Sequence, residues 1–394
     1  MQETWRWFGP SDPVTLDNIV QAGATGIVSS LHHIPAGEGW SLSDIQSHQQ
    51  LIVEKGLEWS VVESVPVHNA IKIRSDDCQQ YIEAYKETLR NLAEAGIKTV
   101  CYNFMPVVDW TRTNLMYELP NKSYALRFEM RAFVAYDLFV LERDGAEQDY
   151  SEEQQVAAKQ YFETMSAEDI AALESNIIAG LPGGDGSYDR NSIRDAIDDY
   201  KDIDEHILRE NLFEFLRQVV PVAEECGIRL CIHPDDPPFS LFGLPRVVST
   251  MADATAILEA ADSIANGLTL CAGSYGARSD NDLVAMVKTF GSRIHFVHLR
   301  NVKREADGSF YESEHLDGDN DMLGLVDALL DEEQQRHQND REDIDIPMRP
   351  DHGHLMGDDI GKAVNPGYSL LGRMKGLAEL RGVILALKYR KTLP

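Results

Sequence analysis

Short apolar segments rich in β-forming residues alternate along this chain with longer segments of helical periodicity. Eight short segments of this kind occur, at residues 4–8, 25–29, 58–63, 99–104, 228–233, 268–271, 294–299 and 346–350. Each is followed by at least one candidate helix, and this alternation is typical of βα units that build a parallel sheet. Because eight βα units close into a barrel, the sequence predicts an α/β fold of the (β/α)8, or TIM-barrel, class.

Local signals mark several helix boundaries. Residues 78–95 are predicted to form a helix because their tyrosines and leucines recur on one face. Ser41, followed three residues later by Asp44, is expected to cap the start of another helix. Four glycines come shortly before a predicted strand, where a left-handed residue commonly ends a helix, and these are Gly56, Gly96, Gly227 and Gly267.

One connection is far longer than a βα unit requires. More than a hundred residues, 105–227, separate the fourth and fifth predicted strands. They are interpreted as a helical insertion with helices at 124–141, 152–162 and 167–179, followed by a glycine-rich loop at 180–186. That loop follows no strand, so it does not fit a dinucleotide-binding motif. We expect one domain over residues 1–394, whose insertion covers the barrel mouth or makes a subunit contact.

Charge and composition exclude several classes of protein. The net charge of −29 argues against nucleic-acid binding, which needs a basic surface. No stretch approaches the roughly 20 apolar residues of a membrane span, and the N-terminal segment MQETWRWFGP does not resemble a signal peptide. The five cysteines are scattered and odd in number, so we expect reduced thiols. We therefore expect a cytoplasmic protein, and a homo-oligomer, most simply a dimer.

Four consecutive predicted strands each end in a side chain that can bind a metal. His233, Cys271, His298 and Asp351 follow or end strands five to eight. The active site of a (β/α)8 barrel is formed at the carboxyl ends of its strands, so these side chains are expected to meet. Two imidazoles, a thiolate and a carboxylate suit a borderline divalent ion such as Mn²⁺, Fe²⁺, Co²⁺ or Zn²⁺.

Other strand-end residues are candidates for substrate binding. If His298 points into the barrel, strand alternation turns Arg300 inward as well, where its guanidinium could hold a substrate carboxylate. Arg6, His32 and Asn103 end the first, second and fourth strands. For these three, a role as loop hydrogen-bonding residues is an equal alternative. Cys231 is expected to pack inside the barrel beneath His233.

Several longer motifs carry a resemblance to a known family. They are WRWFGPSDPV, LHHIP, WSVVESVPVH, CYNFMPVVDWTRT, HPDDPP, GSYG, HLR, RPDHGH and NPGYS. Together they resemble the mannonate dehydratases of hexuronate degradation over nearly the whole chain. The resemblance implies a xylose-isomerase-like barrel that converts D-mannonate to 2-dehydro-3-deoxy-D-gluconate and water with Mn²⁺ or Fe²⁺. It also implies that His233, Cys271, His298 and Asp351 bind the metal, and that His352 and Tyr368 are catalytic.

Removing water from a 2,3-dihydroxy acid requires a base at C2 and an acid at the departing C3 oxygen. We expect His352 and Tyr368 to share these roles. The alternatives are that His352 only supports the site or caps a helix, and that Tyr368 only packs against the last helix. A xylose-isomerase-like sugar isomerase or epimerase is the alternative function. Such enzymes usually bind their metals with several carboxylates, so the predicted thiolate ligand argues against this alternative.

Overall fold

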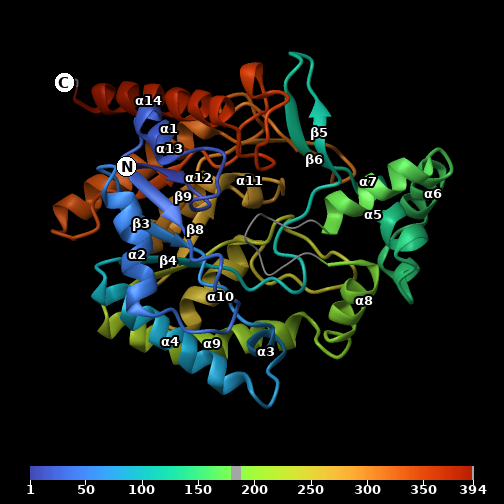
Figure 1. Ribbon diagram of the computed structural model, residues 1–394, viewed down its shortest axis with the longest axis horizontal. Helices are drawn as coiled ribbons and strands as arrows, with labels where there is room; N and C mark the ends of the chain where they lie inside the picture. Colours follow the sequence, from blue (N-terminus) through green and yellow to red (C-terminus); the bar gives the residue numbers. More distant parts are fainter. Residues whose placement is uncertain (179–187, 393–394) are drawn as a thin grey trace.

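The computed structural model of the protein describes residues 1–178 and 188–392, and the predicted loop at 180–186 lies outside them. Eight parallel strands form a closed barrel in chain order (Figure 1). They are β1 (Gln2–Arg6), β2 (Gly26–Ser29), β3 (Glu58–Glu63), β4 (Thr99–Tyr102), β7 (Arg229–Ile232), β8 (Asn266–Cys271), β9 (Ile294–His298) and β12 (Pro347–Arg349). Each matches a predicted strand to within two residues at either end. The predicted (β/α)8 barrel is therefore confirmed.

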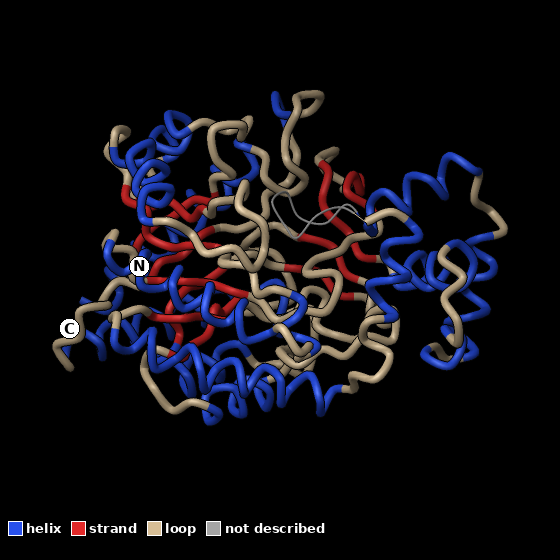
Figure 2. The backbone as a smooth tube through the Cα atoms, turned by 60° about the horizontal axis from the view of Figure 1, so that its bottom comes forward, coloured by secondary structure: helices blue, strands red, loops and turns tan. Residues whose placement is uncertain are grey.

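Helices follow the barrel strands and lie around them (Figure 2). They are α1 (Leu16–Ala22), α2 (Leu42–Val53), α3 (Asn69–Ile73), α4 (Cys78–Glu94), α9 (Glu205–Glu225), α10 (Met251–Ala260), α12 (Leu283–Phe290), α13 (Met322–Gln338) and α14 (Leu370–Thr392). Across the described residues, no helix combines the length and apolar character needed to cross a membrane.

The helix boundaries follow from local chemistry in most cases. The Ser41 hydroxyl accepts a hydrogen bond from the Asp44 backbone N–H and caps α2, as predicted. Gly56, Gly96 and Gly227 have positive φ angles, which confirms their predicted place at helix ends. The prediction for Gly267 is wrong, because this residue lies within β8. A Cβ atom there would lie 2.2 Å from His295 Cδ2, so close packing between β8 and β9 requires glycine.

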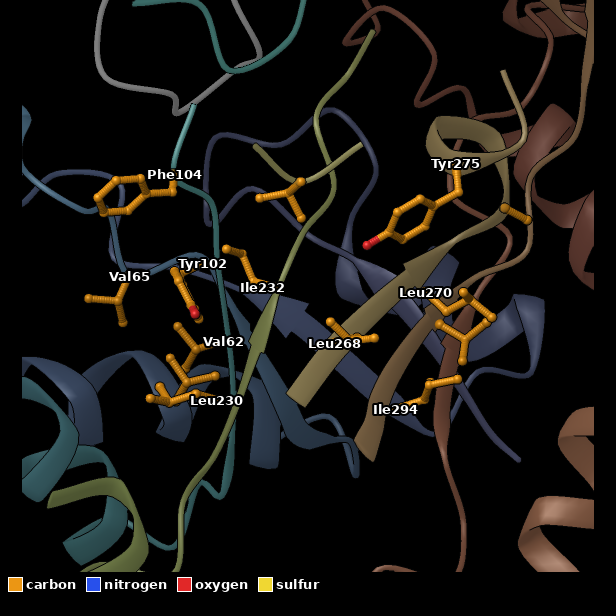
Figure 3. Close-up of a cluster of buried hydrophobic side chains, with 14 of the residues drawn as sticks. Val62, Val65, Tyr102, Phe104, Leu230, Ile232, Leu268, Leu270, Tyr275 and Ile294 are labelled. Carbon is orange, nitrogen blue, oxygen red and sulfur yellow. The ribbon is translucent and has the colours of Figure 1, made fainter. Parts of the chain in front are cut away.

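Two layers of apolar side chains hold the barrel together. A large cluster fills the space between strands and helices, and Figure 3 shows Val62, Leu230, Leu268 and Leu270 among its members. A small cluster with members from five strands lies apart from it and contains Val28, Val61, Cys101, Cys231 and Phe296. Cys231 is fully buried there, in agreement with its predicted packing role. Alternation along the strands thus separates the inner cluster from the outer one.

The long connection after β4 contains both helices and strands. Its helices α5 (Met130–Ala135), α6 (Glu152–Phe162) and α7 (Ala167–Ile178) lie together at one side of the molecule, and α8 (Arg190–Asp198) precedes α9 (Figure 1). The predicted helix at 124–141 is wrong over its first turn, because Tyr124–Phe128 forms strand β6. The remainder is α5 followed by a π-helical turn, Tyr136–Val140.

A second sheet joins this insertion to the connection that follows β9. It has the order β10-β11-β6-β5 and is formed by Val302–Arg304, Phe310–Glu312, Tyr124–Phe128 and Asn114–Glu118. Phe310 of β11 pairs with Phe128 of β6, and their rings stack with centroids 5.8 Å apart. Two long connections that are distant in sequence are therefore fixed to one another.

The contact at Gly267 leads to a stability prediction. Replacing Gly267 by alanine forces the new methyl group against His295 and the Arg293 carbonyl, which should lower the free energy of unfolding by about 1–3 kcal/mol. Gly382, within α14, is the matched control because an added Cβ would meet nothing within 4 Å. Gly382→Ala should raise stability by about 0.5–1 kcal/mol. Urea unfolding of both variants measures the difference, and equal stabilities would contradict the packing argument.

Candidate metal centre

Three side chains that could bind a metal meet where neighbouring barrel strands end. His233 directly follows β7, Cys271 ends β8, and His298 ends β9. One nitrogen of each imidazole and the Cys271 sulfur all lie within 4.8 Å of one another. Cys271 and His298 are register partners on adjacent strands, so the barrel hydrogen bonds themselves place these two ligands side by side.

The two imidazoles are oriented with one nitrogen inward and one outward. His233 Nδ1 lies 2.7 Å from the Pro234 carbonyl oxygen, to which it can donate. His298 Nε2 faces a Glu63 carboxylate oxygen at 3.3 Å. The inner nitrogens, His233 Nε2 and His298 Nδ1, lie 3.2 Å apart. An outer acceptor that fixes the ring and frees the other nitrogen is the usual arrangement around a metal-binding histidine, so this pair fits a cation.

The electrostatic surroundings favour a thiolate at Cys271. Although burial alone would raise it, the positive charge of Arg300 and the contacts with His233 and His298 hold the pKa of the Cys271 thiol well below its usual value. Burial acts to lower the pKa of His233, but the contact with Cys271, together with the charges of Cys101 and Glu63, raises that pKa to about 10. A sulfur anion between two imidazoles is a suitable donor set for a borderline divalent metal.

Asp351, the fourth predicted ligand, lies at the edge of this group. Its Oδ2 is 3.7 Å from His298 Nδ1 and 2.7 Å from Arg300 Nε. Arg349 forms a further ion pair with its other oxygen. Asp351 has a φ angle of 61°, a left-handed conformation in which aspartate is one of the more frequent residues. Its role as a ligand stays a prediction.

Arg300 is surrounded by carboxylates of the protein itself. Its side chain is 2% exposed and pairs with Asp236, Glu312 and Asp351. Arg112, which is fully buried, pairs with the same Asp236 at 2.7 Å and with Glu312 at 2.9 Å. The predicted role of Arg300 in binding a substrate carboxylate therefore requires at least one of these ion pairs to open.

A cavity lies beside the metal-binding group, and most predicted site residues line it. These are Arg6, Asn103, His233, Arg300, Asp351, His352 and Tyr368. His32 does not line this cavity. The centroid of its ring lies 5.8 Å from the centroid of the Phe8 ring. Met105, Asp109 and Trp110 also line the cavity, so the insertion reaches the site.

The two predicted catalytic residues face one another. The rings of His352 and Tyr368 meet edge to face with centroids 5.1 Å apart. His352 Nδ1 lies 3.1 Å from Glu312, and its Nε2 lies 3.9 Å from Asp351. Burial and the nearby charge of Asp351 raise the pKa of Tyr368 to about 12. The phenol therefore holds its proton at neutral pH.

Sequence reasoning missed four charged residues of this site. Glu63 pairs with Arg6 at 2.9 Å and with Arg349 at 3.0 Å. Glu63 and Arg349 each end a barrel strand, so the strand-end rule that predicts the metal ligands could also have predicted these two residues. Arg112 and Glu312 lie outside the barrel strands, and no local pattern predicts where they go.

Comparison with known proteins gives a consistent result over the whole chain. Residues 1–393 match the family described as D-mannonate dehydratase (UxuA). A mannonate dehydratase from Saccharophagus degradans is 63% identical over 389 residues, covering 98% of both chains. Mannonate dehydratase 2 from Agrobacterium fabrum is 57% identical over 384 residues, covering 98% of this chain and 96% of the relative.

A solved structure is similar as well. The crystal structure of mannonate dehydratase from Streptococcus suis serotype 2 aligns with a TM-score of 0.77 and 33% sequence identity. The alignment covers 100% of this chain and 95% of that one.

The role of the sulfur can be tested by metal binding alone. Cys271→Ser replaces a thiolate with a hydroxyl that stays protonated, so Mn²⁺ affinity should fall by at least about tenfold. Cys78→Ser, at the start of α4, is the control and should bind Mn²⁺ like the unmodified protein. Titration of the metal-stripped proteins with Mn²⁺ measures both affinities. Unchanged binding by Cys271→Ser would show that the sulfur is not a ligand.

Proposed function

The chain belongs to the D-mannonate dehydratase (UxuA) family, and from this premise we infer that it removes water from D-mannonate to give 2-dehydro-3-deoxy-D-gluconate. It is accordingly a hydro-lyase of carbohydrate metabolism. The sugar isomerase or epimerase alternative is not favoured, because both curated relatives and the solved structure at 33% identity are mannonate dehydratases.

The observation that carries the proposal is the meeting of His233, Cys271 and His298 beside a cavity lined by His352 and Tyr368. A divalent metal bound by the first three would supply Lewis-acid stabilisation of the charge that develops when C2 loses its proton. We propose Asp351 as the fourth ligand, because its carboxylate already lies 3.7 Å from His298 Nδ1. Mn²⁺ or Fe²⁺ is proposed as the ion, in agreement with the mixed nitrogen, sulfur and oxygen donors.

Side chains of the protein are proposed to transfer the two protons of the reaction. The reaction takes a proton from C2, releases the C3 hydroxyl as water, and lets the resulting enol become a ketone. We propose that His352 and Tyr368 share the base and acid roles, because both are buried at the cavity wall and face one another. Arg300 is proposed to orient the substrate carboxylate. Arg6 and Asn103 are proposed to contact the hydroxyl groups of the substrate that do not react.

Three further proposals concern His32, the cellular location and the oligomeric state. His32 is proposed as a substrate-binding residue only from its position after β2. A cytoplasmic location and a homodimer also stay proposals. The five cysteines are free thiols, which agrees with a reducing compartment.

Substrate and metal requirement can be tested together. The purified protein, stripped of metal, should form a 2-keto acid from D-mannonate only after Mn²⁺ or Fe²⁺ is added. A panel of hexonates that differ in the configuration at C2 or C3 measures selectivity in the same keto-acid assay. Absence of product from every hexonate with either metal would overturn the proposed function.

The catalytic pair can be tested by removing one group at a time. His352→Ala and Tyr368→Phe should each lower kcat by about 10²- to 10⁴-fold, because each removes a group that transfers a proton. Metal content should not change if neither residue is a ligand. Tyr389→Phe, on an exposed position of α14, is the control and should retain full turnover. Near-normal kcat in either site variant would remove that residue from the mechanism.

A further inference from the structure

A buried carboxylate from outside the barrel strands contacts the imidazole of His352. Glu312 is the last residue of β11 and is 3% exposed. Its Oε1 lies 3.1 Å from His352 Nδ1, and the same oxygen accepts hydrogen bonds from Arg112 and Arg300. Three donor groups therefore converge on a single carboxylate oxygen.

These contacts fix where the proton of His352 lies. Guanidinium groups can only donate hydrogen bonds and stay charged, so the pairs with Arg112 and Arg300 keep Glu312 as an ionised acceptor. An ionised carboxylate accepts only, and His352 Nδ1 must therefore carry the hydrogen. In the neutral ring, Nε2 is then the nitrogen with a free lone pair.

The ring of His352 is also held in place by its neighbours. Trp110 and Tyr368 meet it edge to face, with centroids 6.0 Å and 5.1 Å away. Gly367 lies so close that an added Cβ atom would be 3.0 Å from His352 Cδ2. Rotation about the side-chain bonds would break these contacts and the hydrogen bond to Glu312 together.

We propose that Glu312 is a positioning residue that holds His352 with Nδ1 protonated and Nε2 directed to the reacting substrate. This inference rests on the proposed catalytic role of His352. It gives the second sheet a role, because β11 places Glu312 and pairs with β6 of the insertion. Arg112, which precedes β5 in the same insertion, supplies one of the charges that keep Glu312 ionised.

A double-mutant cycle on the complete, Mn²⁺-loaded enzyme tests the proposal. Glu312→Gln keeps the shape of the side chain and removes its charge. An amide can turn either its oxygen or its NH2 group toward Nδ1, so the acceptor that fixes the tautomer of His352 is weakened. We expect kcat to fall by about 10²-fold, with KM for D-mannonate within about threefold. In the His352→Ala background, the same substitution should change kcat by less than about twofold, because the residue it acts through is absent.

Two comparisons separate positioning from a structural role. Glu314→Gln is the matched control, since Glu314 lies two residues away and pairs with His354 and Lys375 instead of His352. It should leave kcat unchanged. Glu312→Asp keeps the charge for the two arginines but withdraws the carboxylate from Nδ1, and it gives the same cycle if Glu312→Gln does not fold.

The outcomes distinguish this inference from the proposed function. If the losses from Glu312→Gln and His352→Ala multiply in the double variant, Glu312 does not act through His352, and the positioning role is overturned. If His352→Ala retains near-normal turnover, the catalytic role of His352 fails first. Loss of bound Mn²⁺ in Glu312→Gln would show that Glu312 supports the metal site instead.

Discussion

The arrangement of the site depends on one guanidinium buried among carboxylates. Arg300 pairs with Asp236, Glu312 and Asp351. Asp236 follows β7, Asp351 follows β12, and Glu312 ends β11. Buried charges are tolerated only when they are paired, and removing Arg300 would leave these three acids with Arg112 and Arg349 as their remaining arginine partners. The turn after β8 packs directly on this group, since a Cβ atom on Gly273 would lie 2.5 Å from Arg300 Nε. Arg300 thus connects the loop after β7, which carries the predicted ligand His233, with the loop after β12, which carries Asp351 and His352.

The sequence was sufficient to predict the barrel and the meeting of three of the four predicted metal ligands. Barrel strands are short, apolar and bounded by helices, so their positions follow from local composition. Once eight strands are assigned, closure brings their carboxyl ends together without any further information. His233, Cys271 and His298 were predicted by this rule, and they lie within 4.8 Å of one another.

Features that depend on contacts distant in sequence were not predicted. Residues 124–128 have the composition of a helix start, but pairing with β5 and β11 makes them a strand. Gly267 has the local context of a helix cap, yet its position is decided by His295 on the neighbouring strand. Arg112 and Glu312 are 200 residues apart, and their ion pair depends on the second sheet that sequence patterns did not indicate.

The pairing of the arginines limits how much they can help an acidic protein to bind an acidic substrate. The chain carries a net charge of −29, which repels anions at a distance. Inside the site, Arg6, Arg300 and Arg349 each face a carboxylate, so they contribute little unpaired positive charge. Cys271, with its lowered pKa, adds a negative charge. A divalent ion held by the three residues that meet at the strand ends would supply the positive charge that a hexonate requires. It would thereby link substrate binding, and not only turnover, to these three residues.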